Sequence, residues 1–150
     1  MNFKSANDIL DFAIQKEEEA AELYRDLAST LTRTDMKAVF EGFAKEEMQH
    51  RAKLIEVKEG NRIISAEKKI FDLKIAESLV DTKPSPNMDY QHALIFAMKA
   101  EKAAFKLYSD LAAATDDQNL KNLFLGLAQE EAKHKLRFEI EYDDQILTEN

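Results

Sequence analysis

Apolar side chains recur at steps of three and four along the first 60 residues, which is the period of an amphipathic helix. The pattern predicts a first helix from about residue 6 to about 31, with Ser5 as its N-cap. A polar break at 32–35 precedes a second helix, and Gly60 fits just past its C-terminus. The inward stripes are Phe12, Ala13, Ala20, Leu23, Tyr24, Leu27 and Leu31 on the first helix, then Phe40, Phe43, Glu47, His50, Leu54 and Val57 on the second.

The same pattern occurs a second time, 84 residues further along the chain. A shift of 84 positions aligns residues 12–54 with 96–138 without a gap and gives 16 identities in 43 positions. The matched pairs include Phe12 with Phe96, Tyr24 with Tyr108, Phe40 with Phe124, Gly42 with Gly126 and His50 with His134. Such an internal repeat predicts that the second half folds as the first does.

Each half is therefore predicted to form a helical hairpin, the first at about 6–59 and the second at about 90–143. In the second hairpin, Asp89 is a good N-cap and the break between helices falls near 115–119. Its inward stripe is Phe124, Leu127, Glu131, His134 and Phe138.

The segment at about 61–88 has no counterpart in the repeat. It contains SAEKKIFDLKIAESLV, which could form a short helix, and then KPSPN, where two prolines end any helix. A connection of this length can cross the whole bundle, so the second and third helices need not be antiparallel neighbours. We predict an all-α four-helix bundle, one domain over 1–150, made of two repeated hairpins joined by a long crossover.

Composition restricts the partners and the metal ligands that the chain can have. The formal net charge of −8 disfavours nucleic acid and anionic membranes as partners, since both reward an excess of Lys and Arg. The chain has no Cys, so disulfides, thiolate metal sites and Cys nucleophiles are excluded, and a metal would need oxygen and nitrogen ligands. The opening MNFKSANDIL has no apolar core of a signal peptide, and no run of 18 uncharged apolar residues follows. We therefore expect a soluble, cytoplasmic protein.

Ionisable residues lie on the inward stripes, where burial of unpaired charge is costly. Glu17 falls among alanines of the first helix, and Glu47 and His50 share the stripe of the second. Two Glu-x-x-His pairs plus one Glu from each other helix make up the ligand set of di-iron and di-manganese carboxylate bundles. The predicted metal ligands are Glu17, Glu47, His50, Glu101, Glu131 and His134.

The repeat distinguishes these residues from their neighbours. Of the acidic run after Lys16, only Glu17 keeps a carboxylate at its mate, Glu101, so the others are interpreted as solvated charges. Glu46 and Glu130 also match each other and stay open as surface charges or as groups that contact a ligand. A lone buried His is more often a hydrogen-bonded core residue, but two of the three His share this motif. The third, His92, is given no role.

Tyr24 and Tyr108 lie seven residues after Glu17 and Glu101, two turns along the same helix face. Each has two interpretations. One is a core aromatic with a polar tip. The other is a phenol that hydrogen-bonds to a ligand carboxylate, orients it and could supply an electron to the reaction.

With these motifs in place, the sequence resembles the ferritin-like superfamily and, within it, the rubrerythrin-like di-iron domains, over both hairpins. The resemblance implies a centre that reacts with O2 or H2O2. It also implies Glu47 and Glu131 as bridging ligands, Glu17 and Glu101 as terminal or bridging ligands, and one His on each iron. Two departures from the family's pattern argue against peroxide reduction by the rubrerythrin route. The additional Glu expected one turn after the third-helix ligand is Ala104, with Ala20 as its mate, and the four Cys of a rubredoxin module are missing.

These observations predict a non-haem di-iron oxidoreductase, peroxidase-like or ferroxidase-like, that reacts with O2 or H2O2 or oxidises ferrous iron. The cofactor would be two Fe ions, or alternatively Mn or mixed Fe/Mn, and electrons would come from a separate donor. One alternative is a non-catalytic iron-binding, trafficking or storage protein. Another is a structural bundle with a metal or proton-sharing core. The sequence leaves open whether the protein forms a homodimer.

Overall fold

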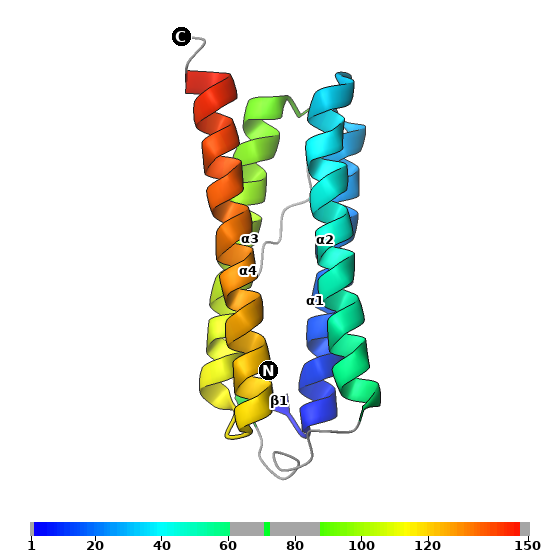
Figure 1. Cartoon of the computed structure of the whole chain (residues 1–150), viewed down its shortest axis with the longest axis vertical. Coiled ribbons are helices and arrows are strands. Elements are labelled where there is room, and N and C mark those ends of the chain that lie inside the picture. Colours follow the sequence, from blue (N-terminus) through cyan, green and yellow to red (C-terminus); the bar gives the residue numbers. More distant parts are fainter. Residues whose placement is uncertain (1, 61–70, 73–87, 148–150) are drawn as a thin grey trace.

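Four long helices make up most of the computed structural model, which describes residues 2–60, 71–72 and 88–147 (Figure 1). The helices are α1 (Ala6–Ser29), α2 (Thr34–Glu59), α3 (Tyr90–Ala114) and α4 (Gln118–Tyr142), and one π-helical turn, Asp143–Leu147, continues α4. Two short strands, β1 (Asn2–Phe3) and β2 (Phe71–Asp72), pair antiparallel with Phe3 opposite Phe71. The predicted all-α four-helix bundle of two hairpins is thereby confirmed.

Side-chain caps fix where three of the helices begin. Ser5 Oγ accepts the backbone N–H of Asp8 at 3.1 Å, as predicted for the start of α1. Asp89 does the same for His92 at 2.8 Å at the start of α3. Asp117 caps α4. These bonds satisfy backbone donors that have no partner inside the first helical turn.

The helix directions confirm the long crossover. α1 packs against α2 and α3 against α4. In Figure 1, α2 ends at the lower end of the bundle whereas α3 begins at the upper end, so these two helices are parallel. Residues 61–70 and 73–87 lie outside the described residues, and with them most of the short helix hypothesised at 65–80. The exception is Phe71–Asp72, which forms strand β2 because its backbone pairs with β1.

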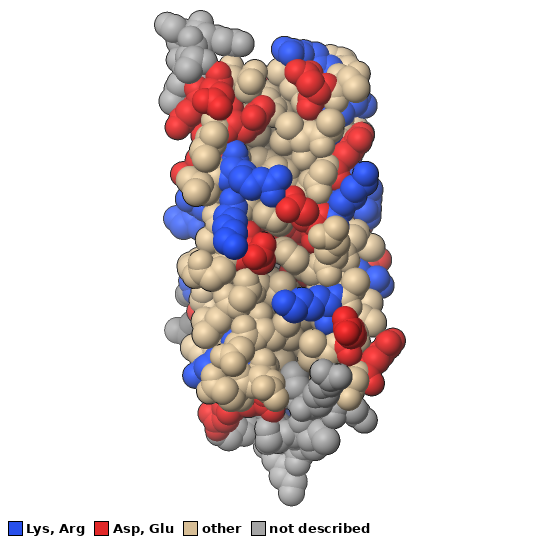
Figure 2. Space-filling view, in the orientation of Figure 1, with Lys and Arg blue, Asp and Glu red and all other residues tan. Residues whose placement is uncertain are grey.

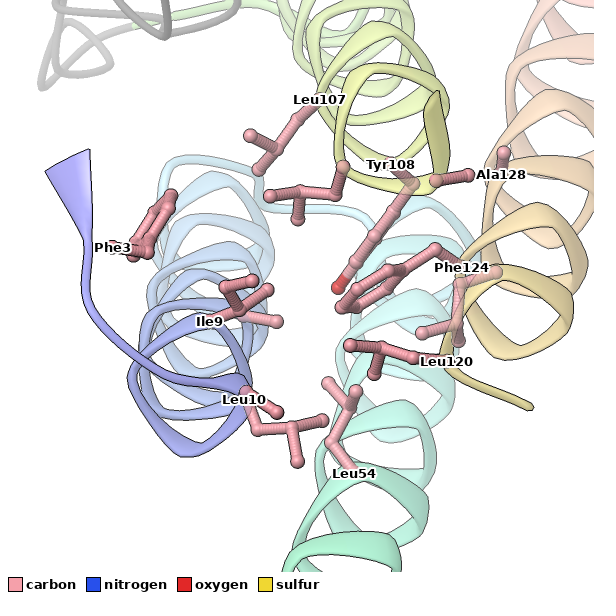
Figure 3. Close-up of a cluster of buried hydrophobic side chains, with 14 residues drawn as sticks. Phe3, Ile9, Leu10, Leu54, Leu107, Tyr108, Leu120, Phe124 and Ala128 are labelled. Carbon is pink, nitrogen blue, oxygen red and sulfur yellow. The ribbon is translucent and has the colours of Figure 1, made fainter. Parts of the chain in front are cut away.

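The interior holds two apolar clusters, one toward each end of the bundle. In the orientation of Figure 1, the lower cluster contains Phe3, Ile9, Leu10, Leu54, Leu107, Tyr108, Leu111, Leu120, Phe124 and Leu127. Figure 3 shows these side chains converging from all four helices and β1. The upper cluster contains Tyr24, Leu27, Phe40, Phe43, Tyr90, Leu94 and Phe138. Burial of these side chains supplies the main stabilisation of the fold.

The surface carries charge of both signs. On the side shown in Figure 2, basic and acidic side chains are interspersed, so the negative excess is not gathered there into one patch. Within the described part of the chain, no helix is both long and apolar enough to cross a membrane.

Candidate metal centre

Six ionisable side chains meet between the two apolar clusters, near the middle of each helix. α1 and α3 contribute one carboxylate each, and α2 and α4 contribute a Glu and a His one turn apart. All four carboxylates are at most 2% exposed. The structure thus brings together every residue that the sequence predicts as a metal ligand, namely Glu17, Glu47, His50, Glu101, Glu131 and His134.

The ligand atoms form two groups that overlap. Glu17 and His50 complete one group of four, and Glu101 and His134 complete the other. Glu47 and Glu131 belong to both, and within each group one atom from every residue lies within 4.8 Å of the others. Two overlapping groups that share two carboxylates are compatible with a dinuclear carboxylate centre.

Both imidazoles turn Nδ1 toward the carboxylates. His50 Nδ1 lies 2.9 Å from Glu131 Oε1 and 3.6 Å from Glu17 Oε2. His134 Nδ1 lies 2.8 Å from Glu47 Oε1 and 3.3 Å from Glu101 Oε1. The two rings are nearly parallel, with their centroids 5.5 Å apart and an interplanar angle of 8°. Each histidine therefore contacts the glutamate of the opposite hairpin's Glu-x-x-His pair.

The cluster leaves many polar atoms unsatisfied. Among the described residues, eight buried side-chain nitrogen and oxygen atoms have no hydrogen-bond partner, and seven of them belong to these six residues. Both oxygens of Glu47 are among them, although Glu47 Oε1 lies 2.8 Å from His134 Nδ1, because that contact is an ion pair without hydrogen-bond geometry. Such atoms are rare in folded proteins because each one loses its hydrogen bonds to water and gains none from the protein. A hard cation bound by carboxylate oxygens and imidazole nitrogens fits these residues.

Electrostatics inside the cluster favour protons where a metal is lacking. Burial, together with the neighbouring carboxylates, raises the pKa of Glu17 and of Glu131 well above the ordinary value. Burial alone would lower the histidine pKa values, but the carboxylates outweigh it. The pKa of His50 rises to about 10 and that of His134 to about 9. Bound cations would take the place of these protons.

The two tyrosines cross between the hairpins. The hydroxyl of Tyr24 on α1 donates to Glu101 on α3, and the hydroxyl of Tyr108 donates to Glu17. Both phenols are about 1% exposed, and burial raises the pKa of each well above its usual value, so they remain protonated donors. Both interpretations of the sequence therefore apply, since each ring packs in an apolar cluster and each hydroxyl bonds to a carboxylate of the site. The sequence could not predict which carboxylate each phenol reaches. That depends on how α1 and α3, which run antiparallel, pack against each other.

Glu46 and Glu130, which the sequence left open, have different surroundings. Glu46 accepts hydrogen bonds from Arg137 Nη1, and its Oε1 lies 3.7 Å from His134 Nε2. Glu130 pairs with Lys133 on its own helix. The sequence analysis did not identify Arg137 as a partner of Glu46. The only available signal was that the repeat pairs Arg137 with a lysine, Lys53, so the two halves differ at this position. His92 is exposed and contacts its own helix cap, Asp89.

This geometry defines the class: a ferritin-like four-helix bundle with a buried cluster of four glutamates and two histidines. The rubrerythrin family model matches residues 8–139, so the chain belongs to the rubrerythrin family. A solved structure titled a hypothetical protein from Pyrococcus furiosus is similar in fold, with a TM-score of 0.66 and 25% sequence identity. The alignment covers 93% of this chain and 89% of that one. No curated protein matches the sequence significantly.

Proposed function

We propose that this protein binds two metal ions, in the first instance iron, and acts as a non-haem oxidoreductase toward O2, H2O2 or ferrous iron. The observation that carries the proposal is the pair of overlapping ligand groups with Glu47 and Glu131 in common. The metal ions, once bound, would supply the exchange of electrons with the oxidant.

The chain's own residues prepare the site for that chemistry. The apolar clusters on both sides exclude water, which strengthens every electrostatic interaction between them. Tyr24 and Tyr108 hold the carboxylates of Glu101 and Glu17 in place through their hydroxyl groups. The two histidines present Nδ1, the nitrogen nearest the carboxylates, as the ligand atom. Either phenol is close enough to the site to donate an electron or a proton.

The position of the additional rubrerythrin carboxylate is alanine in both halves. Ala20 and Ala104 are partly buried and offer no ligand atom. A six-residue set with two shared carboxylates therefore favours reaction with O2, or oxidation of ferrous iron, over peroxide reduction by the usual rubrerythrin route. A separate electron donor would complete a catalytic cycle.

Metal analysis tests the binding part of the proposal. We expect about two metal ions per chain, the number that this ligand set holds in related bundles. Glu47→Ala and His134→Ala should lose most of the metal because each removes a ligand. Glu130→Ala is the matched control, since it removes a neighbouring exposed carboxylate and should keep full occupancy. Full occupancy in both ligand variants would refute the site.

Rapid mixing tests the redox part. Protein loaded with two ferrous ions per chain is mixed with O2 or with H2O2, and ferric absorption is followed. We expect colour to develop within seconds and faster with O2, with no such change in Glu47→Ala. Stable ferrous protein after minutes with either oxidant would favour iron binding or trafficking. Elution as a large cage with many irons per chain would favour storage.

A further inference from the structure

The two histidines of the centre are related by the 84-residue repeat but are not equally enclosed. The side chain of His134 is 2% exposed, whereas that of His50 is 12% exposed. Both lie where α2 meets α4, and both direct Nδ1 inward. The difference therefore comes from what lies outside the two rings.

The outer nitrogen of His134 faces one carboxylate. His134 Nε2 is buried and has no hydrogen-bond partner, and Glu46 Oε1 lies 3.7 Å away. That distance is longer than a hydrogen bond, so the carboxylate attracts the Nε2–H group through its charge. A buried N–H gains free energy from such a partner. A carboxylate at Nε2 also fixes the tautomer, because it keeps the proton there and leaves the Nδ1 lone pair for a metal.

Arg137 holds this carboxylate in position. Its Nη1 donates to both oxygens of Glu46, at 3.0 and 2.8 Å. The guanidinium also lies over the ring of Phe43, 4.3 Å from its centroid. Phe43 in turn packs edge-on against the His134 ring, with centroids 5.0 Å apart. Glu46 and Phe43 therefore lie beside His134, and Arg137 contacts both of them.

The repeat supplies a natural control, because the same contacts are missing around His50. The counterpart of Glu46 is Glu130, which pairs with Lys133 instead. The counterpart of Arg137 is Lys53, which is exposed and forms no ion pair with any described residue. The counterpart of Phe43 is Leu127, which has no aromatic edge to offer.

We propose that Arg137 and Glu46 make the two metal positions unequal, so that metal binds more tightly beside His134 than beside His50. The inference rests on the proposed metal site. Arg137 and Glu46 act as positioning residues, since they reach the metal only through His134. The more exposed His50 side is then the side at which metal enters and leaves.

Titration of metal-free protein with Co²⁺ alone, without oxygen, tests this inequality. The wild-type chain should bind two ions in separable steps. In a His50→Ala background, Arg137→Ala should weaken the remaining step by about 10- to 100-fold, as loss of such a supporting contact does elsewhere. In a His134→Ala background, the same substitution should change affinity by less than about 2-fold. Lys53→Ala, the repeat-matched control, should change neither.

A second readout separates positioning from simple structural support. In Zn²⁺-loaded protein, the nitrogen NMR signals of His134 should report a proton on Nε2 that exchanges slowly with solvent, and that of His50 should exchange faster. Glu46→Ala should accelerate exchange at His134 alone, and Glu46→Gln should restore part of the protection. Glu46→Gln also tests the Co²⁺ prediction if Arg137→Ala does not fold.

The outcomes distinguish the two proposals. If wild-type protein binds no Co²⁺, the metal site itself is wrong. If it binds two ions but Arg137→Ala weakens both backgrounds equally, or neither, the site stands and the inequality is overturned. Equal exchange rates at the two histidines would overturn it as well.

Discussion

The interior of this bundle changes character along its length, from an apolar cluster through a layer of glutamate and histidine to a second apolar cluster. The same four helices build all three layers. In the clusters, side chains are buried and satisfied by contact with one another. In the polar layer, buried atoms lack partners and carboxylates repel one another. The clusters therefore stabilise the fold, while the polar layer costs stability until it is neutralised.

The largest expected effect is in the clusters. Phe40→Ala and Phe124→Ala remove fully buried rings, one from each cluster, and should each lower the free energy of unfolding by about 3–5 kcal/mol. Both variants should still bind two metal ions when folded, because neither ring belongs to the ligand groups. Chemical denaturation and metal analysis together check this. Loss of metal without loss of stability would contradict the division between layers.

A substitution in the polar layer should have the opposite effect on the free energy of unfolding of the metal-free protein. Glu131→Gln keeps an oxygen acceptor 2.9 Å from His50 but replaces a carboxyl group, whose pKa burial raises well above its ordinary value, with a neutral amide. We expect the metal-free variant to be more stable than wild type by about 1 kcal/mol or more at pH 7, because the amide does not have to bind a proton before it can be buried. Metal occupancy should fall sharply. Denaturation with and without metal measures both effects, and destabilisation of the metal-free variant would argue against a costly polar layer.

The pH dependence of folding stability should reverse when metal binds. In the metal-free fold, the pKa values of His50 and His134 are raised to about 10 and about 9, above the ordinary value near 6.5. Their stabilising contribution is therefore fully present below about pH 6.5 and is lost as pH rises through 9 to 10, at no more than about 1.4 kcal/mol per proton and pH unit.

Metal ions must displace these protons, so metal binding should release protons and strengthen as pH rises over the same range. Thermal unfolding at pH 6 and pH 9.5, with and without Zn²⁺, measures the two trends. Metal-free protein that becomes more stable at pH 9.5 would contradict the raised histidine pKa values.

The smallest expected effect is at the boundary between layers. Tyr24→Phe and Tyr108→Phe keep the packing of the clusters but remove a hydroxyl that bonds to a carboxylate of the polar layer. Each should cost about 1 kcal/mol in the metal-free protein. Metal should still bind in both variants, with slower ferrous oxidation if the phenols take part. An unchanged oxidation rate would leave Tyr24 and Tyr108 as packing residues.

The sequence was sufficient for most of the fold because each helix is specified locally. Apolar spacing set the helical period, and Ser5 and Asp89 marked two of the starts. The boundaries shifted by a few residues, since α1 ends at Ser29 rather than near 31 and α4 begins at Gln118 inside the predicted break. Strand β2 was missed because its pairing with β1 is a contact between residues far apart in the chain.

The candidate site was predictable because it is repeated. The 84-residue shift separated Glu17 from its acidic neighbours, and the structure brings all six predicted side chains together. By itself, then, the sequence determined the helices, their inward faces and the six residues, since these follow from periodicity along single helices. Only the tertiary structure decided which hairpin each tyrosine reaches and that Glu46, bonded to Arg137, lies beside His134. Those contacts join different helices, and the spacing along one helix carries no information about its neighbour's register.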